Sequence, residues 1–126
     1  MSRETVWLFS LLLTAHFIAD FSPALTVRMR EAKIGLRPAG PIAMHAGVHT
    51  VLVFAAVWAV LRSPGLALIA AAIEFPTHLA IDYGKMRLGA RFEAVRAPTG
   101  DPFWYAFGVD QWAHCLVLVV IAASVL

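Results

Sequence analysis

Four long apolar stretches limit what this chain of 126 residues can fold into. They cover about residues 5–27, 38–61, 66–83 and 103–126. A helix needs about 20 apolar residues to cross the hydrocarbon core of a bilayer, and each stretch supplies roughly that number. Because hydrophobic residues make up 60% of the chain and charged residues only 14%, almost no sequence remains for a soluble domain. We therefore expect an all-α fold, a four-helix transmembrane bundle that forms one integral membrane domain over residues 1–126.

Basic residues follow the first and third stretches and predict the orientation of the bundle. Eight of the ten lysine and arginine residues lie there: Arg28, Arg30, Lys33, Arg37, Lys85, Arg87, Arg91 and Arg96. By the positive-inside rule, these two loops are cytoplasmic and both termini are outside. Basic loops also attract anionic membrane lipids. Without interleaved aromatic residues they indicate no nucleic-acid partner.

The two halves of the chain follow the same plan, in which a span, a basic loop and a second span succeed one another. His16 and His78 are 62 residues apart, and His49 and His114 are 65 residues apart. Both spacings are close to half the chain length. They predict two tandem two-helix repeats related by a pseudo-two-fold axis along the membrane normal.

Each apolar stretch contains one pair of polar residues four positions apart. The pairs are His16 with Asp20, His45 with His49, His78 with Asp82, and Asp110 with His114. Residues four apart lie on one face of a helix, and ionisable residues inside a membrane are costly and usually functional. Because the spans alternate in direction, we expect a deeper layer of four histidines and a shallower layer nearer the cytoplasm. The deeper layer is His16, His49, His78 and His114.

Imidazole and carboxylate groups together suit zinc or iron. Such groups projecting inward from four helices also build dinuclear sites, so we expect two divalent transition-metal ions. The expected metal ligands are His16, Asp20, His45, His49, His78, Asp82, Asp110 and His114. Some aspartates could instead orient a histidine ring, and hydrogen bonds between helices are an alternative explanation of the pairs. Cys115 is the only cysteine, which excludes an intrachain disulfide and a thiolate cluster.

Further polar residues lie close to these ligands along the chain. Glu74 comes one turn before the histidine of the third stretch. It is a candidate ligand, proton relay or general base, or a carboxyl group kept protonated by burial. Glu74 and Asp110 are the candidate catalytic residues. Gln111 and Thr77 are candidates for hydrogen bonds to ligands, whereas we expect Lys85 to extend toward the lipid headgroups.

The succession of these motifs resembles a known family. The motifs are His16-Phe-Ile-Ala-Asp20-Phe, His45-x-x-x-His49, His78-x-x-x-Asp82-x-x-Lys85 and Asp110-Gln111-x-x-His114. Over nearly the whole chain they resemble the bacterial membrane proteins of domain-of-unknown-function family 3307. The chain departs from that pattern at Ser22-Pro23-Ala24-Leu25, where we expect a glutamine shortly after Asp-Phe. A looser likeness to inner-membrane proteins predicted to be metal-dependent hydrolases implies a bacterial inner (cytoplasmic) membrane location and hydrolytic activity.

These observations lead to one main functional hypothesis and three alternatives. The main hypothesis is an intramembrane metal-binding protein that faces the cytoplasmic leaflet and acts as a metal-dependent hydrolase on a lipid-like substrate. The first alternative is transport or sensing of a divalent metal, although the outer halves of the spans lack polar residues. The others are haem-based electron transfer by the histidine layer and a structural accessory subunit in an oligomer or larger membrane complex.

Overall fold

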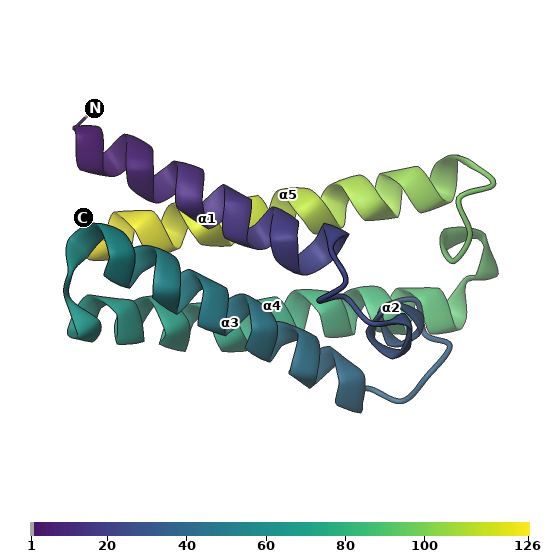
Figure 1. The fold of residues 1–126 in the computed structure, drawn as a ribbon. Helices are drawn as coiled ribbons and strands as arrows, with labels where there is room; N and C mark the ends of the chain where they lie inside the picture. Colours follow the sequence, from purple (N-terminus) through teal and green to yellow (C-terminus); the bar gives the residue numbers. More distant parts are fainter. Residues whose placement is uncertain (1) are drawn as a thin grey trace.

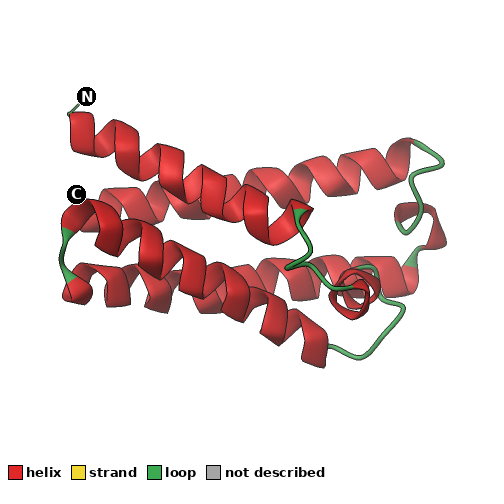
Figure 2. Cartoon of the chain, viewed as in Figure 1, coloured by secondary structure: helices red, strands yellow, loops and turns green. Residues whose placement is uncertain are grey.

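The computed structural model describes residues 2–126, which form a bundle of four long helices (Figure 1). The long helices are α1 (Arg3–Phe21), α3 (Gly40–Leu61), α4 (Pro64–Arg91) and α5 (Asp101–Val125). Two short elements lie between them, α2 (Val27–Lys33) and the 3-10 helix η1 (Glu93–Val95). Within the described residues, Figure 2 shows helices and loops but no strand. The predicted all-α fold is confirmed.

Each of the four long helices is long and apolar enough to cross a membrane. Large apolar side chains also cover the outside of the bundle. Trp7, Phe17, Trp58 and Trp112 are each more than half exposed. Contiguous apolar surface of this kind is rare on a soluble monomer, whereas lipid tails solvate it well. These features indicate a multi-pass membrane protein.

The interior of the bundle has an apolar end and a polar end. The core of the apolar end includes Leu8, Leu12, Val53 and Ile121, which are fully buried or nearly so. Figure 1 shows both chain termini at this end and α2 at the other. The polar pairs follow the apolar core along the helices, on the side of α2.

The first predicted span is too long, because helix α1 ends at Phe21. Ser22 and Pro23 interrupt it. The Ser22 hydroxyl accepts a hydrogen bond from the backbone N–H two residues later (3.1 Å), and proline has no N–H with which to continue a helix. Thr26 then caps α2 by accepting from the Met29 N–H (3.3 Å). The second half of the chain has η1 in its connection instead, and the pseudo-two-fold relation of the halves stays a prediction.

Helix α4 runs well past residue 83, the predicted end of its span, and α2 packs on this extension through backbone atoms. Gly35 has a φ of +80°, and a Cβ there would lie 2.5 Å from the Ala90 nitrogen. A Cβ on Gly89 would lie 2.5 Å from the Ile34 carbonyl oxygen. Both positions therefore require glycine. This contact holds the end of α2, and so its last residue Lys33, against the bundle.

Candidate metal centre

All eight predicted ligands lie inside the bundle, in one buried cluster. Each is at most 7% exposed. Two come from each long helix: His16 and Asp20 from α1, His45 and His49 from α3, His78 and Asp82 from α4, and Asp110 and His114 from α5. The structure thus brings together the residues that helical periodicity places on one face of each span. Their role as metal ligands stays a prediction.

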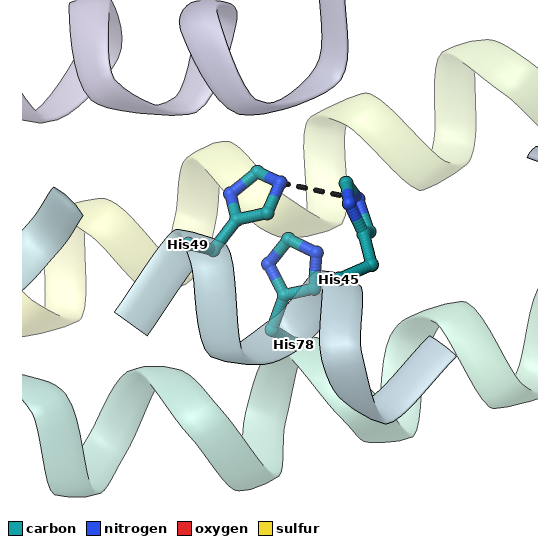
Figure 3. A group of neighbouring side chains, drawn as sticks. All are labelled: His45, His49 and His78. Carbon is teal, nitrogen blue, oxygen red and sulfur yellow. Dashed lines mark hydrogen bonds between the residues drawn. The ribbon is translucent and has the colours of Figure 1, made fainter. Parts of the chain in front are cut away.

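The deeper layer is a compact square of four imidazole rings. Along its sides, the ring centroids are 3.8 Å apart for His49 and His78, 4.1 Å for His78 and His114, 5.1 Å for His16 and His49, and 5.3 Å for His16 and His114. The diagonals are longer, at 6.3 and 6.4 Å. Figure 3 shows His49 of α3 beside His78 of α4, with His45 hydrogen-bonded to His49 between their Nε2 atoms (3.2 Å). Ring nitrogens from four helices are therefore concentrated in one small volume.

His78, Asp82 and His114 form what we call the α4–α5 group. His78 Nε2 lies 3.4 Å from Asp82 Oδ2, and His114 Nε2 lies 3.4 Å from Asp82 Oδ1. All four atoms are buried, and none has a hydrogen-bond partner within residues 2–126, although Lys33 Nζ lies 3.3 Å from Asp82 Oδ1. An unsatisfied buried polar group costs about 1–3 kcal/mol, and native proteins contain few of them. A cation bound between the three side chains would satisfy all four atoms.

Glu74 fixes the orientation of the His78 ring. Glu74 Oε1 lies 2.9 Å from His78 Nδ1 in a hydrogen bond, and 4.0 Å from His49 Nδ1. When Glu74 is ionised it can only accept, so His78 Nδ1 is then the donor and the lone pair of Nε2 is directed toward Asp82. A carboxylate on the far nitrogen of a histidine ligand is a frequent feature of metal sites. Among the roles open to Glu74, this geometry favours orienting a ligand.

Asp110 is paired with Lys85 at the edge of the cluster. Lys85 Nζ donates to Asp110 Oδ2 at 2.8 Å, so the expectation that Lys85 extends to the headgroups was wrong. Because α4 continues past residue 83, Lys85 lies one turn after Asp82 on the face that meets α5. The other oxygen, Asp110 Oδ1, has no hydrogen-bond partner among the described residues and lies 3.7 Å from His114 Nε2. Asp110 is therefore available as a further ligand beside the α4–α5 group.

Gln111 makes the predicted hydrogen bonds to the cluster, whereas Thr77 does not. The Gln111 amide nitrogen donates to Asp20 Oδ2 (3.1 Å), and its Oε1 is 3.2 Å from His16 Nε2. Thr77 Oγ1 donates instead to the Ile73 carbonyl of its own helix (2.6 Å). Gln111 therefore links α5 to α1 across the polar end.

Lys33 belongs to the cluster although its sequence position, in a basic loop, suggests a surface residue. Its Nζ lies 3.0 Å from Asp20 Oδ1, 3.3 Å from Asp82 Oδ1 and 3.2 Å from His45 Nε2. The residue is only 6% exposed. Asp20 also lies 3.0 Å from His45 Nε2 through the same oxygen. An ammonium group thus lies where a second metal ion would meet Asp20.

A short amphipathic helix brings Lys33 into the cluster. Met29, Ala32 and Lys33 form the buried face of α2. Their helical spacing is the one sequence signal that could have identified Lys33 as a buried residue. Burial lowers the pKa of Lys33, but the neighbouring carboxylates of Asp82 and Asp20 raise it above its ordinary value. Lys33 is therefore a fixed positive charge inside the polar end.

Three sets of side chains have ligand atoms within 4.8 Å of one another: His45, His49 and His78; His16, Asp20 and His49; and the α4–α5 group. Tetrahedral zinc, with bonds of about 2.0–2.1 Å, holds its ligand atoms about 3.3 Å apart. The 3.4 Å separations in the α4–α5 group are close to that value. The cluster could therefore hold a metal with small side-chain movements.

Comparison with known proteins identifies a family but no function. No curated protein and no solved structure matches the chain, and no match supports the looser likeness to metal-dependent hydrolases. One family profile, described as protein of unknown function (DUF3307), matches residues 8–126. The matched region contains every residue of the cluster. The chain therefore belongs to the DUF3307 family.

Proposed function

We propose that this protein binds a divalent transition-metal ion within the membrane, at the α4–α5 group. The observation that carries the proposal is a set of buried atoms that have no hydrogen-bond partner in the part of the chain that the structure describes: His78 Nε2, His114 Nε2 and both oxygens of Asp82. Two imidazole nitrogens and a carboxylate, with a fourth position left for a water or substrate molecule, suit zinc or iron.

The charges around the cluster support the binding of one divalent ion. Four carboxyl groups and two ammonium groups line it: Asp20, Glu74, Asp82, Asp110, Lys33 and Lys85. With all six ionised and the imidazoles neutral, this set has a formal charge of −2. Uncompensated charge is costly in a medium of low dielectric constant. One divalent cation would balance it.

A second ion, as a dinuclear site requires, would bind at His16, Asp20 and His49. The Lys33 ammonium donates a hydrogen bond to Asp20 Oδ1 at 3.0 Å, and it also lies 3.3 Å from Asp82 Oδ1 of the α4–α5 group. It must therefore move before a second ion can bind, and Lys33 borders a cavity into which it could turn. We expect the α4–α5 group to fill first, because Asp20 already accepts hydrogen bonds from Lys33 and Gln111.

Hydrolysis is the chemistry that we propose for this centre. A bound divalent ion supplies a nucleophile by lowering the pKa of water to near neutrality. Asp110 is our candidate general base, because its Oδ1 is unpartnered beside His114. Glu74 is a positioning residue, because it is engaged with the far side of the His78 ring.

The orientation in the membrane follows from the basic residues. Eight of ten lysine and arginine residues lie at the α2 end, in α2, the end of α4 and the adjoining loops. By the positive-inside rule we propose that this end faces the cytoplasm. The metal centre would then be reached from the cytoplasmic leaflet.

Transport and haem binding are less well supported. Beyond the histidine square, the apolar core around Leu12, Val53 and Ile121 offers a departing ion no polar side chain. Neighbouring histidine rings along the square are only 3.8–5.3 Å apart, which leaves no space for a porphyrin between them. A structural ion that only clamps the bundle is the alternative that needs an experiment.

Elemental analysis and visible spectroscopy of the purified protein test the proposal. We expect about one zinc or iron ion per chain in the wild type and its loss in His78→Ala. Glu93→Gln, which changes an exposed carboxylate in η1, is the matched control and should retain the ion. A wild type without stoichiometric metal, or one with a Soret band, would contradict the proposal.

Chelation separates chemistry from a structural clamp. Structural metal contributes folding free energy, so its removal should greatly lower the unfolding temperature. Because Lys33 and Lys85 already neutralise part of the cluster, we expect a chelated wild type that still folds. Unfolding of the chelated protein under native conditions would favour the structural alternative.

A further inference from the structure

A cavity of about 730 Å³ adjoins the metal centre at the polar end of the bundle. It lies between the end of α1, helix α2, the loop after η1 and the first turns of α5. Asp20, Lys33 and Gln111 line it and are also members or neighbours of the buried cluster. The cavity is therefore the approach to the centre from the α2 end.

The cavity is strongly basic. Four basic side chains line it, Arg30, Lys33, Lys85 and Arg96, against the single carboxylate of Asp20. The two lysines already have carboxylate partners. Within residues 2–126, neither arginine forms an ion pair, and Arg96 Nε is buried without a hydrogen-bond partner. Two guanidinium groups are thus free to bind an anion, and guanidinium binds phosphate well.

The other walls of the cavity are apolar. Aromatic rings form one side, with Phe103 parallel to Phe107 at 6.1 Å and Phe21 edge-on to Phe107 at 6.5 Å. Leu25 and Ile34 line it as well. Phe21 is more than half exposed on the lipid-facing side of α1. A ligand with an anionic head and an apolar tail would match both kinds of wall.

We infer that this cavity binds the phosphate headgroup of a lipid, with Arg30 and Arg96 as its principal partners. The acyl chain would lie along Phe21, Phe103 and Phe107. Binding itself requires no metal. If the proposed hydrolase function also holds, phosphate-bearing lipids are the substrate class, and this extension rests on that proposal. Water would then give its hydroxyl group to phosphorus and its proton to the departing lipid alcohol.

Ligand binding to chelator-treated full-length protein in a neutral detergent tests the inference. The probes are lysophosphatidic acid, the monoacylglycerol with the same acyl chain, and inorganic phosphate. Because hydrogen bonds to a charged group are stronger than those between neutral groups, we expect lysophosphatidic acid to bind at least about tenfold more tightly than the monoacylglycerol. Equal affinity of these two lipids would overturn the inference, and so would inorganic phosphate binding as tightly as lysophosphatidic acid.

Variants separate the cavity from the general basic surface. We expect the double variant Arg30→Gln/Arg96→Gln to lose about tenfold or more in affinity for lysophosphatidic acid. Arg87→Gln removes an exposed charge at the same end of α4 but outside the cavity, and should change the affinity by less than about twofold. Equal losses of affinity in the double variant and in Arg87→Gln would show non-specific attraction to basic surface and would contradict the inference.

A metal-free variant separates this inference from the proposed function. His78→Ala removes a side chain of the metal centre that does not line the cavity. We expect it to bind lysophosphatidic acid as the wild type does. Loss of lipid binding in this variant would mean that the lipid binds at the metal centre and would overturn the cavity assignment. Absence of metal in the wild type would contradict only the proposed function.

Discussion

The same His-x-x-x-Asp motif occurs in α1 and in α4, but the two aspartates have different surroundings. Asp20 accepts hydrogen bonds from Lys33 and Gln111 and contacts His45. Asp82 has two buried oxygens without hydrogen bonds, although Lys33 Nζ approaches one of them to 3.3 Å. Asp20 thus has hydrogen-bond donors from the protein itself, whereas Asp82 is contacted only by side chains that form no hydrogen bond with it within residues 2–126. The motif alone therefore does not determine the partners of its aspartate.

Replacing each aspartate by its isosteric amide should produce the largest difference. We expect Asp82→Asn to lose the stoichiometric ion, because it removes the carboxylate that joins His78 to His114. We expect Asp20→Asn to retain it, because Asp20 belongs to the partnered motif. Elemental analysis of both purified variants measures this, with Asp101→Asn, an exposed aspartate, as the control. If Asp20→Asn lost the ion and Asp82→Asn retained it, the α1 motif and not the α4 motif would be the binding site.

Removing the ammonium group should make the α1 motif resemble the α4 motif. Taking away one partner of a buried ion pair costs about 3–5 kcal/mol, so we expect Lys33→Met to lower the unfolding free energy of the chelated protein by about that amount. Arg28→Met, on the exposed face of the same helix, should change it by less than about 0.5 kcal/mol. Denaturant titration in detergent measures both.

The same Lys33→Met variant should also bind zinc more tightly than the wild type, because a positive charge next to the carboxylates has been removed. Zinc titration with a competing chelator measures the affinity. Weaker zinc binding in this variant would show that Lys33 supports the site rather than competes with the ion.

Glu74→Gln should sharpen the comparison, since the hydrogen bond of Glu74 is to His78 of the α4 motif. The glutamine amide occupies the same space, but it lacks the negative charge with which a carboxylate holds the proton on His78 Nδ1. Substitutions at such supporting positions typically weaken metal affinity by about 10–100-fold. The same zinc titration measures this, with Glu93→Gln as the exposed control. Unchanged affinity would exclude the positioning role.

The smallest effect is expected for Gln111→Leu. It removes the amide that donates to the Asp20 carboxylate and contacts His16, and a hydrogen bond to a charged group contributes about 1.5 kcal/mol at the low end of its range. We expect the unfolding free energy to fall by about that amount and the metal content to stay unchanged. Loss of the ion would mean that α1 takes part in binding it.

The sequence predicted the parts of the structure that depend on local periodicity. Hydropathy identifies four spans, and the spacing of four residues places each polar pair on one face of its helix. The positions of Lys33 and Lys85 depend instead on contacts between distant segments. For Lys33 these are the break at Ser22 and the docking of α2 on α4. These contacts also determine that, within the described residues, Asp20 has hydrogen-bond donors and Asp82 does not, so the motif alone could not predict this difference.

The backbone contact at Gly35 and Gly89 also has a consequence for tolerance to insertions and deletions. Lys33 and Asp20 are 13 residues apart, and the glycine contact anchors the far end of that segment on α4. An insertion in the turn at residues 22–26 could bulge outward at a small entropic cost. A single methyl group added at Gly89 would instead push the anchor away from α4. Lys33 would then be displaced from the buried cluster. A substitution at Gly89, which contacts none of the cluster's side chains, would thus change the charge of the cluster.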